Sequence, residues 1–195
     1  MTRIIAGTAG GRRLTVPAGR DTRPTSDRAR EGLFGTILAI RGSLDGARVL
    51  DLYAGSGAVG LEALSRGAPD VLLVESDARA ARVIRANIEA LGLPGARLIA
   101  DRVERVLARG PGDHPARDLV FADPPYATPD AEVQRVLGAL RDRGWLAPGA
   151  LVVVERATRS GILTWPAGYT PERCRGYGEA TLWYGLGAGA GPAAA

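Results

Sequence analysis

The sequence predicts an α/β protein built on a mostly parallel sheet with helices on both faces. From residue 48 onward, short apolar segments rich in β-branched residues alternate with helical segments, which is the pattern of β-α-β units whose strands run parallel. A glycine-rich loop separates the first of these strands from its helix. The last two strand-like segments are joined by only Gly178 and Glu179, a link short enough to form an antiparallel hairpin that closes the sheet.

Two short strands are expected before the alternation begins, at residues 3–7 and 12–17, and the glycine-containing link between them predicts a hairpin that projects from the main body. A helix follows from about residue 27 to residue 40, with Thr25 or Ser26 as its N-cap. The remaining elements are expected, in order, as strand 49–53, helix 57–66, strand 71–75, helix 78–91, strand 96–100, helix 103–108, strand 119–122, helix 130–143, strand 150–155, strand 173–177 and strand 180–186.

This order of elements predicts three regions. Residues 1–24 form a β-hairpin extension, residues 25–186 one compact domain, and residues 187–195 a Gly/Ala/Pro-rich tail that we expect to be disordered. No apolar run is long enough to span a membrane, and the N-terminus lacks the apolar core of a signal peptide, so a cytoplasmic protein is expected. The single cysteine and the single histidine exclude an internal disulfide and leave no zinc site, so no metal is expected.

All 25 basic residues are arginine, and their excess lies near the N-terminus. Residues 1–30 hold seven arginines against two aspartates, a net charge of +5, whereas the rest of the chain holds 18 arginines against 19 acids, a net charge of −1. A GC-rich genome explains the choice of arginine but not this distribution. A basic patch on a nearly neutral body indicates a polyanionic partner, most often nucleic acid. The candidate RNA-binding residues are Arg3, Arg12, Arg13, Arg23, Arg28 and Arg30.

The glycine-rich loop has the spacing of a nucleotide-binding loop. Gly55, Gly57 and Gly60 form a G-x-G-x-x-G pattern between a strand and a helix. In such loops the glycines allow a tight turn, close approach of the ligand and close packing of the helix on the strand. Glu75 follows 18 residues after Gly57, near the position of a ribose-binding acid. The pattern therefore predicts a cofactor that contains a nucleoside.

Asp51, in the strand before the loop, distinguishes between such cofactors. NAD-binding strands normally enter the loop without an acid, because the pyrophosphate lies over it. S-adenosylmethionine has an ammonium group and no phosphate, so it suits this position. We expect Asp51 to bind its amino group, Glu75 its ribose and Asp101 its adenine, although each acid alone could be a helix cap or a solvated loop residue. The candidate cofactor-binding residues are Asp51, Tyr53, Ala54, Gly55, Ser56, Gly57, Glu75, Ser76, Asp101 and Arg102.

A second motif follows the strand at residues 119–122. That strand must stop at Asp123, because Pro124 cannot donate to a sheet ladder. Pro124 and Pro125 both fix their φ angle, so the carboxylate, a carbonyl and the ring of Tyr126 are held at the carboxyl end of a strand. In open α/β sheets, ligands bind at that edge.

The chemistry of this motif suits an amine on a nucleobase. Such an amine is a poor nucleophile, because its lone pair is delocalised into the ring. Two acceptors, the Asp123 carboxylate and the Pro124 carbonyl, could hold its hydrogens and direct the lone pair at a methyl carbon. Tyr126 could stack on a base flipped out of its helix. Alternatively, the two prolines only end a strand. The candidate catalytic residues are Asp123, Pro124, Pro125 and Tyr126.

Four segments together resemble the RsmD family of bacterial methyltransferases, which act on N2 of guanine 966 in 16S ribosomal RNA; the segments are residues 3–14, 22–34, 51–57 and 123–126. The resemblance covers roughly residues 1–186. It implies a class I S-adenosylmethionine-dependent methyltransferase fold (Rossmann-like), with a seven-stranded sheet whose last strand is antiparallel. It also implies an enzyme of the EC 2.1.1 class that acts on 16S rRNA in the 30S subunit or its assembly intermediate. We expect the protein to be a monomer.

Two other functions remain open at this point. The proline motif also serves adenine-N6 methylation of DNA, although such enzymes usually carry a target-recognition domain for which 195 residues leave no room. A protein of the same fold could instead bind RNA without catalysis, which the intact motif at residues 123–126 argues against.

Overall fold

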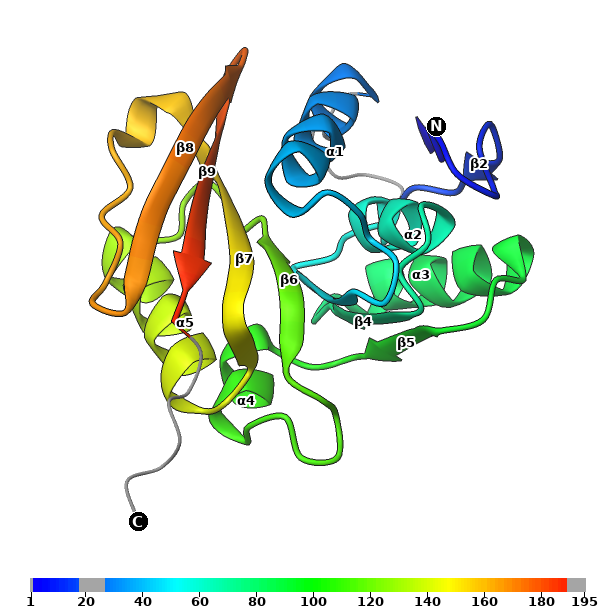
Figure 1. Ribbon diagram of the computed structural model, residues 1–195. Helices are drawn as coiled ribbons and strands as arrows, with labels where there is room; N and C mark the ends of the chain where they lie inside the picture. The colour runs from blue at the N-terminus through cyan, green and yellow to red at the C-terminus, as the bar shows by residue number, and fades with distance from the viewer. Residues whose placement is uncertain (1, 18–26, 189–195) are drawn as a thin grey trace. The chain divides into compact units, whose positions relative to one another are not determined.

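The computed structural model describes residues 2–17 and 27–188, and the chain divides into two compact units, Met1–Asp101 and Arg102–Ala195 (Figure 1). The first unit contains β1 (Thr2–Arg3), β2 (Arg13–Leu14), α1 (Asp27–Arg41), β3 (Arg48–Leu52), α2 (Ala58–Ser65), β4 (Asp70–Val74), α3 (Ala78–Leu91) and β5 (Ala96–Ile99). The second unit contains α4 (Val103–Ala108), β6 (Arg117–Ala122), α5 (Asp130–Asp142), β7 (Leu146–Ala157), a short 3-10 helix (Thr158–Ser160), β8 (Tyr169–Tyr177) and β9 (Ala180–Gly187).

The main sheet has seven strands and is mostly parallel. The first unit contributes strands in the order β5-β4-β3, and both of these pairs are parallel. The second contributes β6-β7-β9-β8, in which β7 runs parallel to β6 while β9 runs antiparallel to both of its neighbours. The predicted alternation of strands and helices and the predicted terminal hairpin are therefore confirmed.

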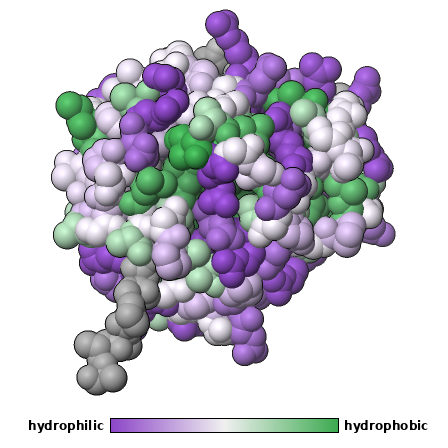
Figure 2. All heavy atoms as spheres, in the orientation of Figure 1, coloured by the Kyte–Doolittle hydropathy of each residue, from purple (hydrophilic) through white to green (hydrophobic). Residues whose placement is uncertain are grey.

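The core of each unit includes the strand segments that form continuous apolar runs in the sequence. In the first unit, residues 71–74 of β4 are fully buried, and α2 packs on β3 and β4. In the second unit, residues 151–154 of β7 are buried and α4 contacts α5. Hydrophilic residues cover much of the face seen in Figure 2, with hydrophobic residues visible as separate islands. Burial on both faces is the reason why these strands lack an alternating pattern.

Two strands are longer than expected. β7 begins at Leu146 and β8 at Tyr169, although the additional stretches contain residues that disfavour strands, Pro148 and Gly149 in β7 and Pro171 in β8. Pro171 lies at a register irregularity in the pairing of β8 with β9, and β8 is the edge strand of its sheet. An edge strand tolerates proline because one side of it needs no ladder donor.

The N-terminal hairpin differs from the expected projecting ribbon. β1 and β2 do pair as antiparallel strands, but each is only two residues long. The backbone N–H groups of Ile5 and Ala6 donate to the carboxylate of Glu62 in α2, at 2.6 and 3.0 Å, and Thr8 N–H donates to the carbonyl of Ser65 at 2.8 Å. Glu62 accepts the hydrogen bonds that the N–H groups of Ile5 and Ala6 would donate to a partner strand in a longer hairpin. The hairpin therefore lies on α2 and does not project from it.

Candidate functional site

The glycine loop begins with a strained residue. Tyr53, directly after β3, has φ of 60°, and it is the one non-glycine residue with positive φ in the described part of the chain. A left-handed backbone at such a residue costs on the order of 1–3 kcal/mol, and strain of this kind gathers at binding sites. Gly55 and Gly57 are also left-handed, with φ of 60° and 79°. The loop therefore keeps a fixed, unusual path between β3 and α2.

Gly55, Gly57 and Gly60 are each required for a different structural reason. A Cβ at Gly60 would lie 3.0 Å from Val71 and 3.1 Å from the carboxylate of Asp51, so this glycine permits α2 to pack closely on the sheet. A Cβ at Gly57 would lie 3.1 Å from Leu73. At Gly55 the added atom would meet nothing closer than 4.0 Å, so the requirement there is the left-handed φ. Close helix packing at the third glycine is the role that the spacing predicted.

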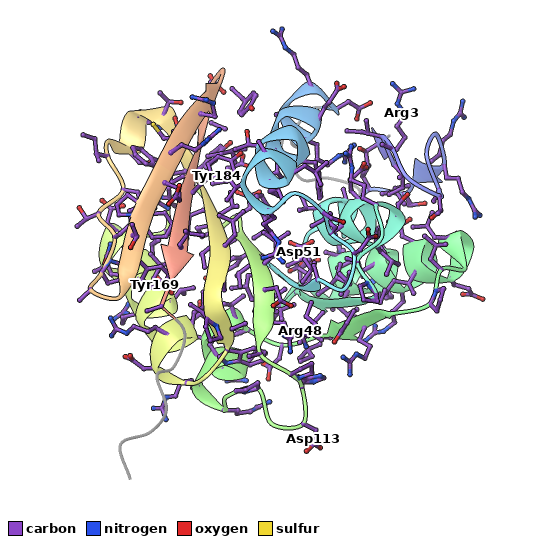
Figure 3. All side chains as sticks on the ribbon, in the orientation of Figure 1. Arg3, Arg48, Asp51, Asp113, Tyr169 and Tyr184 are labelled. Carbon is purple, nitrogen blue, oxygen red and sulfur yellow. The ribbon has the colours of Figure 1, made fainter. Side chains whose placement is uncertain are left out.

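Asp51 lies in β3, the strand that leads into the loop, and is buried; Figure 3 labels its position. Its Oδ2 atom accepts a hydrogen bond from the backbone N–H of Gly60 at 2.8 Å. The pKa of Asp51 is raised to about 7: burial is the main cause, the hydrogen bond from Gly60 opposes the rise, and the charge of Glu75 adds to it. The carboxyl group thus changes protonation state near neutral pH and can supply either a negative charge or a neutral hydrogen-bonding group beside the loop.

Glu75, at the end of β4, joins the loop to the next helix. Its Oε2 atom accepts from Gly55 N–H at 2.8 Å, and its Oε1 atom accepts from Asp77 N–H at 2.8 Å. Asp77 is itself the N-cap of α3 and accepts from the backbone N–H groups of the first helical turn. Glu75 is 4% exposed. Its buried carboxylate therefore holds Gly55 of the loop and Asp77 at the start of α3 in place.

The other predicted cofactor residues lie around these two acids in the chain. Tyr53, Ala54 and Ser56 are half-buried, Ser76 is exposed, and Asp101 is half-buried after β5, where the first unit ends. Arg102 is exposed and is the N-cap residue of α4, so it belongs to the second unit. The first unit alone therefore presents a glycine loop with two buried carboxylates, a set that suits a nucleoside carrying a cationic group.

Asn87 is a polar residue of this region that the sequence reasoning missed. It lies in α3 and is 2% exposed. Its amide donates to the carbonyls of Ser56, in the glycine loop, and of Thr15, which follows β2, each at 2.9 Å. The sequence did contain a signal: Asn87 continues the apolar stripe formed by Ala80, Ile84 and Leu91, and a polar residue on such a stripe needs a buried partner.

In the second unit, the proline motif follows β6 as predicted. Asp123 is half-buried and Pro124 is buried, whereas Pro125 is exposed and Tyr126 is 47% exposed. Thr128 N–H donates to the carbonyl of Pro125 at 2.8 Å, so the chain turns directly after the tyrosine. The motif presents an aromatic ring to solvent on a backbone fixed by two prolines and a turn.

Acidic neighbours surround the ring of Tyr126. Burial raises the pKa of its phenol, and the nearby charges of Glu155, Asp123 and Glu179 raise it further, while Arg159 opposes them. The phenol is therefore neutral at physiological pH.

Arg156, near the end of β7, holds the segment after the motif and was also missed. It is 5% exposed, and its Nη2 atom donates to the carbonyl of Thr128 and to the carboxylate of Asp130, each at 2.9 Å. Neither partner is close in sequence, so no local pattern indicated this role. Arg156 fixes the turn that follows Tyr126.

The predicted RNA-binding arginines have different surroundings. Arg3, Arg13 and Arg28 are exposed, and Arg3 lies at the periphery beside β1 in Figure 3, where it pairs with Asp27 at 3.0 Å. The guanidinium of Arg12 instead donates to the carbonyls of Leu91, at 2.9 Å, and Ala90 at the end of α3.

Arg30 corrects the prediction. It is 1% exposed, and its guanidinium donates to the Thr2 hydroxyl, the Arg3 carbonyl and the Asp27 carboxylate. A phosphate cannot reach a side chain buried in this way, so Arg30 attaches α1 to β1. Arg23 lies outside the described residues, as do Thr25 and Ser26, the expected helix cap.

Within the described ranges, no helix combines the length and the apolar character that a membrane span requires. The same residues form no cluster of histidine, cysteine and acidic side chains that could hold a metal ion.

Comparison with known proteins gives a family and several close structures. The model of the family described as conserved hypothetical protein 95 matches residues 2–185. Ribosomal RNA small subunit methyltransferase D of Escherichia coli K12 is 37% identical over 171 residues, which are 88% of this chain and 82% of the relative. The solved structure of the putative methyltransferase yhhF from Escherichia coli has a TM-score of 0.83 at 36% identity, covering 96% of this chain and 98% of that one.

A more distant structure shows the fold alone. SMU.776, a putative methyltransferase complexed with SAH, has a TM-score of 0.60 at 15% identity and covers 76% of this chain and 47% of that one.

Proposed function

The chain belongs to the RsmD family, whose model is described as conserved hypothetical protein 95, and on this premise we propose that it transfers a methyl group from S-adenosylmethionine to the exocyclic N2 amine of a guanine in 16S rRNA, at the position of guanine 966. Membership makes the protein a methyltransferase. The name of the Escherichia coli relative supports small-subunit ribosomal RNA as the substrate.

One observation carries the choice of cofactor. The glycine loop follows the strand of Asp51, and two buried carboxylates hold its ends: Glu75 accepts from Gly55 in the loop, and Asp51 accepts from Gly60 in the first turn of α2. A pyrophosphate over such a loop would be repelled by them, whereas the ammonium group and the ribose of S-adenosylmethionine offer a cation and hydrogen-bond donors. In this proposal Asp51 is the partner of the ammonium group, and Glu75 binds the ribose while it fixes Gly55.

The proline motif supplies the chemistry at the base. The Asp123 carboxylate and the Pro124 carbonyl accept the two hydrogens of the guanine amine, which directs the nitrogen lone pair at the methyl carbon. When bound, S-adenosylmethionine would supply the methyl group from its sulfonium centre and leave as the neutral thioether, and the amine would lose one proton to solvent water. Tyr126, neutral and half-exposed, stacks on the flipped base.

The exposed arginines provide the attraction to RNA. Arg3, Arg13 and Arg28 carry positive charge on the N-terminal part of the chain, where a phosphate backbone can be neutralised. We assign this role to the extension at residues 1–24 and the start of α1, and methyl transfer to residues 25–186. The substrate is then 16S rRNA within the 30S subunit or an assembly intermediate.

The test is methyl transfer to 30S particles that lack the modification, with Asp123→Ala as the variant. We expect transfer to fall by about a hundredfold to a thousandfold, the loss that follows removal of one catalytic hydrogen-bonding group, while affinity for S-adenosylhomocysteine changes less than about threefold, well under 1.4 kcal/mol. Asp113→Ala is the matched control, because it removes an exposed loop carboxylate of the same unit. An active Asp123→Ala enzyme, or methylation of duplex DNA in place of ribosomal particles, would contradict the proposal.

A further inference from the structure

Asn87 occupies a position where a polar side chain is unfavourable. It lies in the middle of α3 on the face formed by Ala80, Ile84 and Leu91, and it is 2% exposed. Asparagine costs a helix interior up to about 0.7 kcal/mol relative to alanine, and burying its amide costs more unless the amide is fully hydrogen-bonded. The side chain therefore needs partners from other segments.

Those partners come from two segments that the proposed function gives different tasks. The Oδ1 atom accepts from Thr15 N–H at 2.9 Å, and the Nδ2 group donates to the Thr15 carbonyl at 2.9 Å. The same Nδ2 group donates to the carbonyl of Ser56 at 2.9 Å. Ser56 lies between Gly55 and Gly57, the two left-handed glycines of the loop. A single amide thus joins the glycine loop to the N-terminal segment.

The N-terminal segment is fixed to α3 at a second point. Arg12 donates to the carbonyls of Leu91 and Ala90 at the end of that helix, so residues 12–15 are bonded to α3 at both of their ends. Arg13, between these two attachments, is exposed. The direction of the Arg13 side chain therefore depends on both attachments. The attachment at Asn87 also holds the glycine loop, through the carbonyl of Ser56.

From this arrangement we infer that Asn87 is a positioning residue that couples occupation of the glycine loop by the cofactor to binding of RNA by the N-terminal segment. The inference rests on the proposed function. A cofactor that fixes the Ser56 carbonyl also fixes the plane of the Asn87 amide, because both Nδ2 hydrogens are committed to carbonyls. The plane of the amide then sets the position of Thr15 and the direction of Arg13.

Linkage makes the coupling reciprocal. If the cofactor tightens RNA binding by some factor, RNA tightens cofactor binding by the same factor. Coupling between two sites ordinarily amounts to about 5-fold to 150-fold in affinity.

The first measurement uses the unaltered protein. Amide hydrogen exchange of the peptide that contains Thr15 is followed with and without saturating S-adenosylhomocysteine. We expect exchange at Thr15 to slow by at least about fivefold when the ligand is present, the lower end of ordinary coupling. Unchanged exchange at Thr15 with the ligand demonstrably bound overturns the inference while the proposed function stands. Failure of the ligand to bind at all refutes the proposed function, and the inference with it.

Two variants then assign the effect to Asn87. Asn87→Ala removes all three bonds, and Asn87→Asp keeps the acceptor for Thr15 N–H but cannot donate to the carbonyls of Ser56 and Thr15. Both are expected to bind S-adenosylhomocysteine without slowing exchange at Thr15. Glu62→Gln is the control, because Glu62 holds Ile5 and Ala6 and has no contact with Ser56; it keeps the response.

The RNA side is measured by titrating S-adenosylhomocysteine into the protein with and without 30S particles that lack the modification. Wild-type protein is expected to bind the ligand at least about fivefold more tightly when RNA is present, and Asn87→Asp to bind it equally in both conditions. A folded Asn87→Asp protein that retains the full enhancement, or equal affinities in wild-type protein, overturns the inference.

Discussion

The carboxylate of Asp51 accepts a hydrogen bond from the backbone N–H of Gly60, with 2.8 Å between Oδ2 and the nitrogen. This bond ties the end of β3 to the first turn of α2 while the carboxyl group remains buried. Burial raises the pKa of Asp51 from its ordinary value of 3.8 to about 7.

The raised pKa predicts how stability changes with pH. Between about pH 4 and pH 7 the folded protein binds a proton at Asp51 that the unfolded chain does not bind, so the free energy of unfolding falls as the pH rises through this window and levels off above about 7. Asp51→Asn keeps an acceptor for Gly60 and has nothing to titrate, so that contribution disappears. The whole contribution is about 4 kcal/mol, the equivalent of about three pKa units, and the window from pH 5 to pH 8 covers about two of those units, about 3 kcal/mol. Urea unfolding of both proteins at pH 5 and pH 8 measures that part.

Cofactor binding should change in the opposite direction. The ionised carboxylate attracts an ammonium group, so affinity for S-adenosylhomocysteine is expected to rise as the pH increases through 7 in wild-type protein and to stay level in Asp51→Asn. Parallel pH profiles for the two proteins would show that Asp51 does not meet the ligand.

Tyr126 is predicted to act on the substrate and not on the fold. Its ring is 47% exposed, and stacking on a base is worth about 1–3 kcal/mol. Tyr126→Ala should therefore lower kcat/KM for 30S particles by about 5-fold to 150-fold and leave the free energy of unfolding within about 0.5 kcal/mol of wild type. Tyr126→Phe retains the ring and serves as the control. A phenylalanine variant as weak as the alanine variant would mean that the hydroxyl, and not stacking, is required.

Arg13 and Arg30 form a matched pair for testing the basic patch. Arg13 is exposed, and Arg30 is buried with three acceptors. Arg13→Ala should weaken RNA binding and reduce the salt dependence of the binding constant by about one counterion, because one phosphate is no longer neutralised, with little change in stability. Arg30→Ala should destabilise the protein by about 1–3 kcal/mol, the cost of leaving buried hydrogen-bond partners unsatisfied, and the protein that remains folded should show an unchanged salt dependence of RNA binding. A salt slope that does not change in Arg13→Ala would show that Arg13 is only a solvated residue.

Gly7 and Gly11 isolate the attachment of the hairpin to α2. Both glycines are left-handed, with φ of 83° and 82°, so alanine strains the backbone equally at each. A Cβ at Gly7 would lie 1.8 Å from the carbonyl oxygen of Ser65, whereas at Gly11 it would meet nothing within 4 Å. Gly7→Ala should therefore be less stable than Gly11→Ala by at least about 1–3 kcal/mol, the usual cost of overpacking. Equal free energies of unfolding in urea would mean that the hairpin does not lie on α2 in solution.

The sequence predicted the features that local pattern controls. The glycine loop, the proline motif and the strand and helix order all depend on residues that are neighbours in the chain, and the boundaries of α3 and α4 match the expected ones. The glycine loop directly follows β3 and the proline motif directly follows β6, as the sequence predicted.

What the sequence could not provide is the set of long-range partners. Arg28 and Arg30 are equivalent in a count of charges, yet only burial shows that Arg30 belongs to the interior. The partners of Arg12 are 78 and 79 residues away, and the backbone N–H groups that Glu62 accepts from are 56 and 57 residues away. Such pairs arise from how elements pack, and no pattern within a short window encodes them.

The attachment of the first strands has a consequence for how the chain folds during its synthesis. The backbone of Ile5 and Ala6 is held by Glu62, and Thr15 by Asn87. All of these partners leave the ribosome later than the segment that they hold. The N-terminal arginines therefore emerge first but become ordered only after α3 has been made, since closing loops of this length precedes the contacts that stabilise them. A nascent chain that stalls before residue 87 lacks the partner of Thr15, so the position of the basic segment is not fixed. Such a chain is not expected to bind RNA through that segment in the proposed way.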